Sequence, residues 1–131
     1  MGIFGNLFGT SNDGGKKEEK TLPWISLISI EQLDNIKEKS KTKTQFIYKH
    51  STTCGISRMV LNSLLSNYSL NEEEADLYYL DLLSYRSVSN EVGVKFQVIH
   101  ESPQLLVIKN EITVFHTSHG GINEVDFNKY I

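Results

Sequence analysis

Cys54 is the only cysteine in the chain, and its surroundings favour a reactive thiol. A strand-like apolar run, 45–48, precedes it, and an amphipathic helix-like run begins at or near it. A helix N-terminus presents unpaired N–H groups and a partial positive charge, so a thiol in the first turn ionises more readily. The alternative is a small buried hydrophobe, against which the polar flanks and Gly55 argue. We therefore predict that Cys54 is a redox nucleophile.

The spacing Cys54-Gly55-Ile56-Ser57 puts a serine where a C-x-x-C motif has its resolving thiol. The Ser57 hydroxyl can donate a hydrogen bond to a thiolate and lower its pKa, but it cannot form a disulfide. The remaining chemistry is monothiol: Cys54 accepts a sulfur adduct, and a thiol from outside removes it. With Thr53 as the predicted N-cap, the thiol pKa would fall from about 8.5 toward about 3.5–7.5. We expect Thr53, Gly55 and Ser57 to contact the substrate.

Pro103 is the second part of the predicted site. It precedes the third core strand of the pattern, and a cis Ser102–Pro103 bond there would aim the backbone of Ser102 at an extended substrate. The alternative is an ordinary trans proline at a strand start. The order of strands around it favours the cis form, so we predict that Ser102 and Pro103 also bind substrate.

Composition excludes several classes of function. A formal charge of −3 and a pI near 5.8 give no general attraction to nucleic acid or to an anionic membrane, and no apolar run approaches the roughly 20 residues of a membrane span. The N-terminus has no basic region typical of a secretory signal, and one cysteine cannot form an internal disulfide. We therefore expect a cytoplasmic monomer.

The chain has four histidines, His50, His100, His116 and His119. We expect a surface or capping role for each of them, and we predict no metal or bound cofactor.

Two segments differ in composition. Residues 1–20, rich in glycine and polar side chains, predict a disordered tail and linker, and 21–131 predict one domain. The domain is expected to begin with an extended segment at 22–27. Its predicted strands lie at 44–48, 77–83, 104–108 and 112–116. Its predicted helices run from a Ser29 cap to Glu38, from about 54 to 68, over 87–94 and, as a closing helix, over 122–131, with an exposed acidic turn at 71–76.

This order, β-α-β-α-β-α-β-β-α, joins a parallel βαβ half to an antiparallel hairpin and a last helix. That is the arrangement of the thioredoxin fold. We therefore predict an α/β domain with a central mixed sheet of four to five strands and helices on both faces.

Three groups of residues resemble the monothiol bacilliredoxin family, the YtxJ-like bacterial proteins of the bacillithiol system. These are the stretch 50–57, Pro23-Trp24 with Leu33, and the stretch 101–104, within a match from about Leu22 to Ile131. The resemblance implies a thioredoxin-like fold and the removal of bacillithiol from mixed disulfides on cytoplasmic client proteins. It implies Cys54 as nucleophile and Pro103 as the proline of the groove. The family usually carries proline where this chain has Gly55.

Three functions fit these residues. The leading hypothesis is an enzyme, a thiol–disulfide oxidoreductase that takes a small thiol, with bacillithiol as co-substrate, from S-thiolated client proteins. The alternatives are a non-catalytic thioredoxin-like binding module and a redox sensor whose cysteine carries a protective thiol cap. An ordinary pKa for Cys54, near 8.5 or above, favours the binding module. Adduct formation without turnover favours the sensor.

Overall fold

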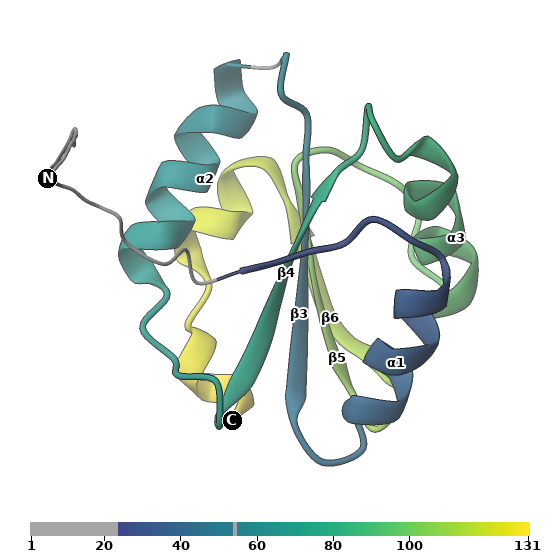
Figure 1. Cartoon of the computed structure of the whole chain (residues 1–131). Helices are drawn as coiled ribbons and strands as arrows, with labels where there is room; N and C mark the ends of the chain where they lie inside the picture. Colours follow the sequence, from purple (N-terminus) through teal and green to yellow (C-terminus); the bar gives the residue numbers. More distant parts are fainter. Residues whose placement is uncertain (1–23, 54) are drawn as a thin grey trace, which may run out of the picture.

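The computed structural model describes residues 24–53 and 55–131. A five-stranded mixed sheet, in the order β2-β4-β3-β5-β6, lies between two layers of helices (Figure 1). The strands are β2 (Ile25–Ser26), β3 (Thr44–His50), β4 (Ala75–Asp81), β5 (Gln104–Lys109) and β6 (Ile112–Ser118). The helices are α1 (Glu31–Lys39), α2 (Gly55–Asn67), α3 (Arg86–Phe96) and the short 3-10 helices η2 (His119–Glu124) and η3 (Phe127–Tyr130).

The strand directions confirm the predicted arrangement. β3 and β2 both run parallel to β4, whereas β5 runs antiparallel to β3 and pairs with β6 as a hairpin. In Figure 1, α2 and the C-terminal 3-10 helices cover one face of the sheet, and α1 and α3 cover the other. This is the thioredoxin fold. The predicted tail at 1–20 lies outside the described residues.

The central strand β3 is buried along its whole length. Its side chains alternate between the two faces, as in any strand. Phe46 and Tyr48 belong to the core under α2, whereas Ile47 belongs to the core under α1 and α3. Burial on both faces explains why three apolar residues follow one another at 46–48 in this strand. It also means that Lys49 and His50, at its C-terminal end, enter the protein interior.

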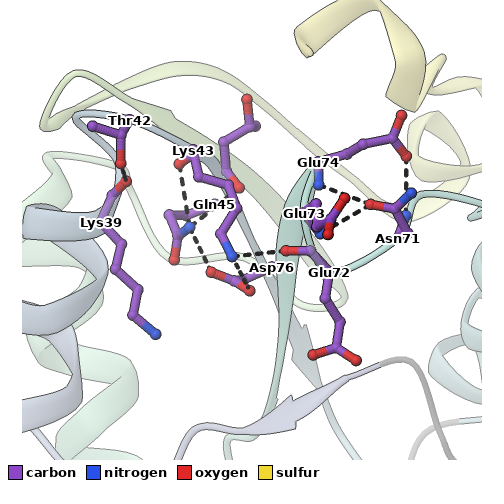
Figure 2. Close-up of polar contacts among 10 residues, drawn as sticks. Lys39, Thr42, Lys43, Gln45, Asn71, Glu72, Glu73, Glu74 and Asp76 are labelled. Atoms are coloured by element: carbon purple, nitrogen blue, oxygen red, sulfur yellow. Dashed lines mark hydrogen bonds and ion pairs between the residues drawn. The ribbon is translucent and has the colours of Figure 1, made fainter.

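The N-terminal ends of β3 and β4 are fastened by polar contacts (Figure 2). Lys43 Nζ lies 3.1 Å from Asp76 Oδ1, and the Gln45 side-chain amide donates to Asp76 Oδ2 at 2.8 Å. The side-chain oxygen of Asn71 accepts from the backbone N–H of Glu74 at 3.0 Å, closing the turn before β4. Asp76 was expected in the exposed acidic turn, but it is buried because the strand starts one residue before it. This end of the sheet is opposite to the one from which β3 runs toward Cys54.

The predicted Ser29 cap of α1 is wrong. The helix begins at Glu31, and Ile30 occupies the N-cap position without a side-chain hydrogen bond. Gln32 Oε1 instead accepts the backbone N–H groups of Ile28 at 2.7 Å and Ser29 at 3.0 Å. Only the half of the capping box in which the glutamine reaches backward is therefore formed.

Two further expectations about helices are corrected. An amphipathic helix was predicted from about 54 to 68, with its apolar residues on one buried face, but Ile56 and Met59 are 58% and 72% exposed. Val60 and Leu64 alone of the apolar residues of α2 turn fully into the core. The predicted closing helix at 122–131 is replaced by η2 and η3. Of the helices that the structure describes, none has both the length and the apolar character needed to cross a membrane.

Candidate functional site

The connection from β3 to α2 carries the predicted nucleophile. β3 ends at His50 and α2 begins at Gly55, so residues 51–54 form the link between them. Cys54 itself lies outside the described residues, and its role stays a prediction from sequence. Gly55 is exposed, and a Cβ atom built on it meets no atom within 4 Å. The first residue of the helix therefore borders open space.

Ser57 lies in the first turn of α2 and is fully buried. Its Oγ has no hydrogen-bond partner among the described residues. Its main-chain carbonyl accepts a 3.0 Å hydrogen bond from the Tyr48 hydroxyl. This bond joins the first turn of α2 to β3. A buried hydroxyl without a partner is uncommon in proteins, and it leaves this side chain able to donate to another group.

Thr53 is exposed. Its hydroxyl lies 3.3 Å from that of Ser51, and within 24–53 and 55–131 it makes no hydrogen bond to an N–H group of α2. Since α2 begins at Gly55, Thr53 also stands one position too early for an N-cap. The predicted capping contact is therefore wrong.

The Ser102–Pro103 peptide bond is cis, as predicted. Gln104 pairs with Lys49 in the sheet, so the backbone of Pro103 comes beside the end of β3, where the chain turns toward Cys54. Ser102 Oγ is buried and has no hydrogen-bond partner in the described part of the chain. A second unpaired hydroxyl therefore lies at the same end of the sheet as Ser57.

The segment before Pro103 is held by hydrogen bonds. The Gln104 side chain donates to the carbonyl of Ile99 at 3.0 Å and accepts the N–H of Glu101 at 3.3 Å. The N–H of His119 donates to the carbonyl of Pro103 at 3.0 Å. Because Gln104 is itself buried, these bonds fix the 99–103 segment against the sheet.

His50 is buried rather than on the surface, which corrects the expectation for this residue. Burial lowers the pKa of His50; Asp81 opposes this shift and Arg58 adds to it. Its Nδ1 lies 3.4 Å from the Tyr48 hydroxyl, and its ring centroid is 5.3 Å from that of Tyr79. An uncharged imidazole is therefore expected beside the strand end at neutral pH.

Lys49 belongs to no sequence motif that marks it as functional. It is fully buried on the α3 side of the sheet, with Nζ 3.3 Å from the carbonyl oxygen of Ser89 and 3.2 Å from Nδ1 of His100. Burial lowers its pKa to about 8. The available signal was strand alternation: Ile47 faces that core, so the residue two positions later faces it too.

Residues 25–127 match the family described as monothiol bacilliredoxin BrxC. A solved thioredoxin-fold protein, proposed to be an oxidoreductase, is 33% identical with a TM-score of 0.69, over 82% of this chain and 93% of that one. Thioredoxin from Schistosoma mansoni is 19% identical with a TM-score of 0.63, over 82% and 95% of the two chains. Thioredoxin from Malassezia sympodialis is 16% identical with a TM-score of 0.62, over 82% and 91%.

The last two similarities concern the fold alone. The family match covers most of the chain, and it agrees with the cis proline and with the order of the strands. The protein therefore belongs to the monothiol bacilliredoxin family, a group of thiol redox proteins with the thioredoxin fold.

Proposed function

We propose that this protein is a monothiol thiol–disulfide oxidoreductase that removes a low-molecular-weight thiol from protein mixed disulfides, with Cys54 as nucleophile. The observation that carries the proposal is the pairing of Gln104 with Lys49. It brings the cis proline, Pro103, beside the strand end that leads to the single cysteine. Family membership supports bacillithiol as the small thiol.

In the first step the Cys54 thiolate attacks the sulfur of the small thiol in a client mixed disulfide. A new S–S bond forms between Cys54 and the small thiol as the old S–S bond breaks. The client sulfur leaves as a thiolate and takes a proton from water. The client is thereby reduced, and Cys54 carries the adduct.

In the second step a second molecule of small thiol, as thiolate, attacks the sulfur of the adduct. Cys54 leaves as a thiolate, and the two small thiols depart as a symmetrical disulfide. The net reaction exchanges one client mixed disulfide and one thiol for a client thiol and a small-molecule disulfide. A serine at position 57 forms no disulfide, so the second thiol must come from outside the chain.

The remaining site residues have supporting roles in this proposal. Ser57 donates its unpaired hydroxyl to the Cys54 sulfur and stabilises the thiolate. The backbone of Ser102, aimed by Pro103, pairs with the extended client segment. Thr53 and Gly55 border the sulfur in sequence, and the open space at Gly55 leaves room for the adduct.

Intact mass spectrometry tests the proposal. The protein is incubated separately with a peptide mixed disulfide of bacillithiol, of glutathione and of coenzyme A. We expect one small-thiol adduct per chain, located on Cys54, with stoichiometric release of reduced peptide. The Cys54→Ala variant should release none. Peptide release by Cys54→Ala at the wild-type rate would refute the role of Cys54.

A further inference from the structure

Lys49 is a buried cation for which the described residues supply no acidic partner. Its side chain is fully buried, and no acidic group within 24–53 and 55–131 forms an ion pair with it. Its two described contacts are the carbonyl oxygen of Ser89 and Nδ1 of His100. A buried, unpaired ammonium is unfavourable for folding, so its presence calls for an explanation other than stability.

The contact with His100 has a definite direction. An ammonium group has three donors and no acceptor, so the 3.2 Å contact requires Nδ1 of His100 to accept. A neutral imidazole whose Nδ1 accepts carries its proton on Nε2. Burial lowers the pKa of His100, the charges of Lys49 and Arg86 add to this shift, and Glu101 opposes it. The ring is therefore neutral at pH 7 and presents an Nε2–H donor.

His100 lies at an open cleft. His100 is exposed and lines a cleft of about 370 Å³ between α3 and the segment that leads to Pro103. The walls also include Ser89, Asn90, Gly93, Val98 and Ile99. The volume lies within the range of small-molecule sites, in which a few polar groups on apolar walls set the orientation of the ligand.

We infer that Lys49 positions His100 as a neutral Nε2–H donor, and that this donor binds a carbonyl or carboxylate oxygen of the small thiol. His100 is then a specificity-determining residue and Lys49 a positioning residue. The inference rests on the proposed function for the identity of the ligand. It predicts preference for small thiols that carry such an oxygen over simple hydroxyalkyl thiols.

Nitrogen-15 NMR of the histidine ring tests the positioning. In the wild-type protein at pH 7 we expect an unprotonated, hydrogen-bonded Nδ1 and a protonated Nε2 for His100. In Lys49→Met the Nδ1 signal should move toward an average of tautomers, and the pKa of His100 should rise because a nearby positive charge is lost. A protonated Nδ1 in the wild type, or an unchanged spectrum in Lys49→Met, would overturn the inference.

Binding is tested without catalysis. S-methylglutathione carries amide and carboxylate oxygens, whereas 2-(methylthio)ethanol carries neither. Titration of the first should shift the His100 Nε2–H signal, and titration of the second should not. His100→Phe should weaken binding of S-methylglutathione by about three- to tenfold, the worth of one hydrogen bond.

Two variants separate the donor from mere packing. His100→Gln keeps an N–H donor and should retain most of the affinity, whereas Lys49→Met should lose part of it, less than His100→Phe loses, because the released imidazole still carries its proton on Nε2 for part of the time. The double variant should be no weaker than His100→Phe alone, because both changes remove one interaction. Equal binding by wild type and His100→Phe would refute the inference. None of these binding and NMR measurements requires catalysis at Cys54. They can therefore refute the inference about His100 without refuting the proposed function, and the reverse also holds.

Discussion

The Tyr48 hydroxyl donates a 3.0 Å hydrogen bond to the main-chain carbonyl of Ser57. This bond connects the central strand to the first turn of α2, across the connection that contains Cys54. Both residues are buried, so the bond forms away from water. The position of the helix start is therefore fixed by the strand, in addition to the hydrogen bonds of the helix itself.

Replacement of Tyr48 by phenylalanine tests this connection. The ring and its packing are kept, and only the hydroxyl is lost. We expect the free energy of unfolding in urea to fall by about 1 kcal/mol. Amide hydrogen exchange should accelerate in the first turn of α2 and remain unchanged in α3. Uniform acceleration in both helices would contradict a local role for the hydroxyl.

Ser57→Ala separates reactivity from stability. The Ser57 hydroxyl has no partner in the described residues, so its only proposed bond is the one to the Cys54 sulfur, and its removal should lower the free energy of unfolding by no more than about 1 kcal/mol. Loss of a donor to the sulfur should raise the apparent pKa of Cys54, measured from alkylation rate against pH. Ser66→Ala, an exposed position on the same helix, is the matched control. An unchanged pKa in Ser57→Ala would exclude the donor role.

Lys49 predicts a dependence of stability on pH. Burial lowers its pKa in the folded protein to about 8, from the 10.5 of a lysine in water. Between these values the unfolded chain binds a proton that the folded protein does not, so the unfolding free energy of the wild type should rise with pH from about 8 to 10.5. Below pH 8 the buried charge destabilises the fold.

Lys49→Met should therefore be more stable than the wild type at pH 7, by on the order of 1–3 kcal/mol. The difference should shrink as pH rises toward 10.5. Urea unfolding at several pH values measures it, with Lys39→Met, an exposed lysine, as control. If Lys49→Met is less stable than the wild type at pH 7, the buried ammonium stabilises the fold, which contradicts the expected cost of burying it.

The resemblance to the family implies proline at the position of Gly55, and the structure leaves room for a Cβ atom there. Gly55 is the first residue of α2, where a missing N–H and a fixed φ are favourable, and a built Cβ meets no atom within 4 Å. Gly55→Pro should raise the free energy of unfolding by about 0.4–1 kcal/mol through the unfolded chain. Gly55→Ala is the control, with a smaller expected gain. A large loss of stability in thermal unfolding would show that the helix start needs glycine.

Sequence patterns predicted the buried strands and the position of the cis proline correctly. The apolar runs of β3 and β4 predicted a buried parallel pair, which the structure confirms, and Ser102-Pro103 predicted the cis bond from its place before β5. These features depend on local composition and on the order of strands. They required no knowledge of side-chain contacts.

The errors arise where tertiary packing decides the type of helix or the burial of a side chain. The C-terminal residues have apolar side chains at helical spacing but form η2 and η3, in which Ile122 and Phe127 pack on the core under α2. His50 was expected to have a surface or capping role and no role was predicted for Lys49, although strand alternation continues through both. Their burial depends on α3 and on Tyr79, which no local pattern reveals.

Steady-state de-thiolation measures the central claim most directly. A fluorescent client peptide carrying a bacillithiol mixed disulfide is mixed with a catalytic amount of protein and an excess of bacillithiol, and release of reduced peptide is followed. We predict many turnovers per chain for the wild type and none above the uncatalysed rate for Cys54→Ala. A wild-type protein that releases one peptide per chain and then stops, or a Cys54→Ala variant that turns over like the wild type, would contradict catalysis at Cys54.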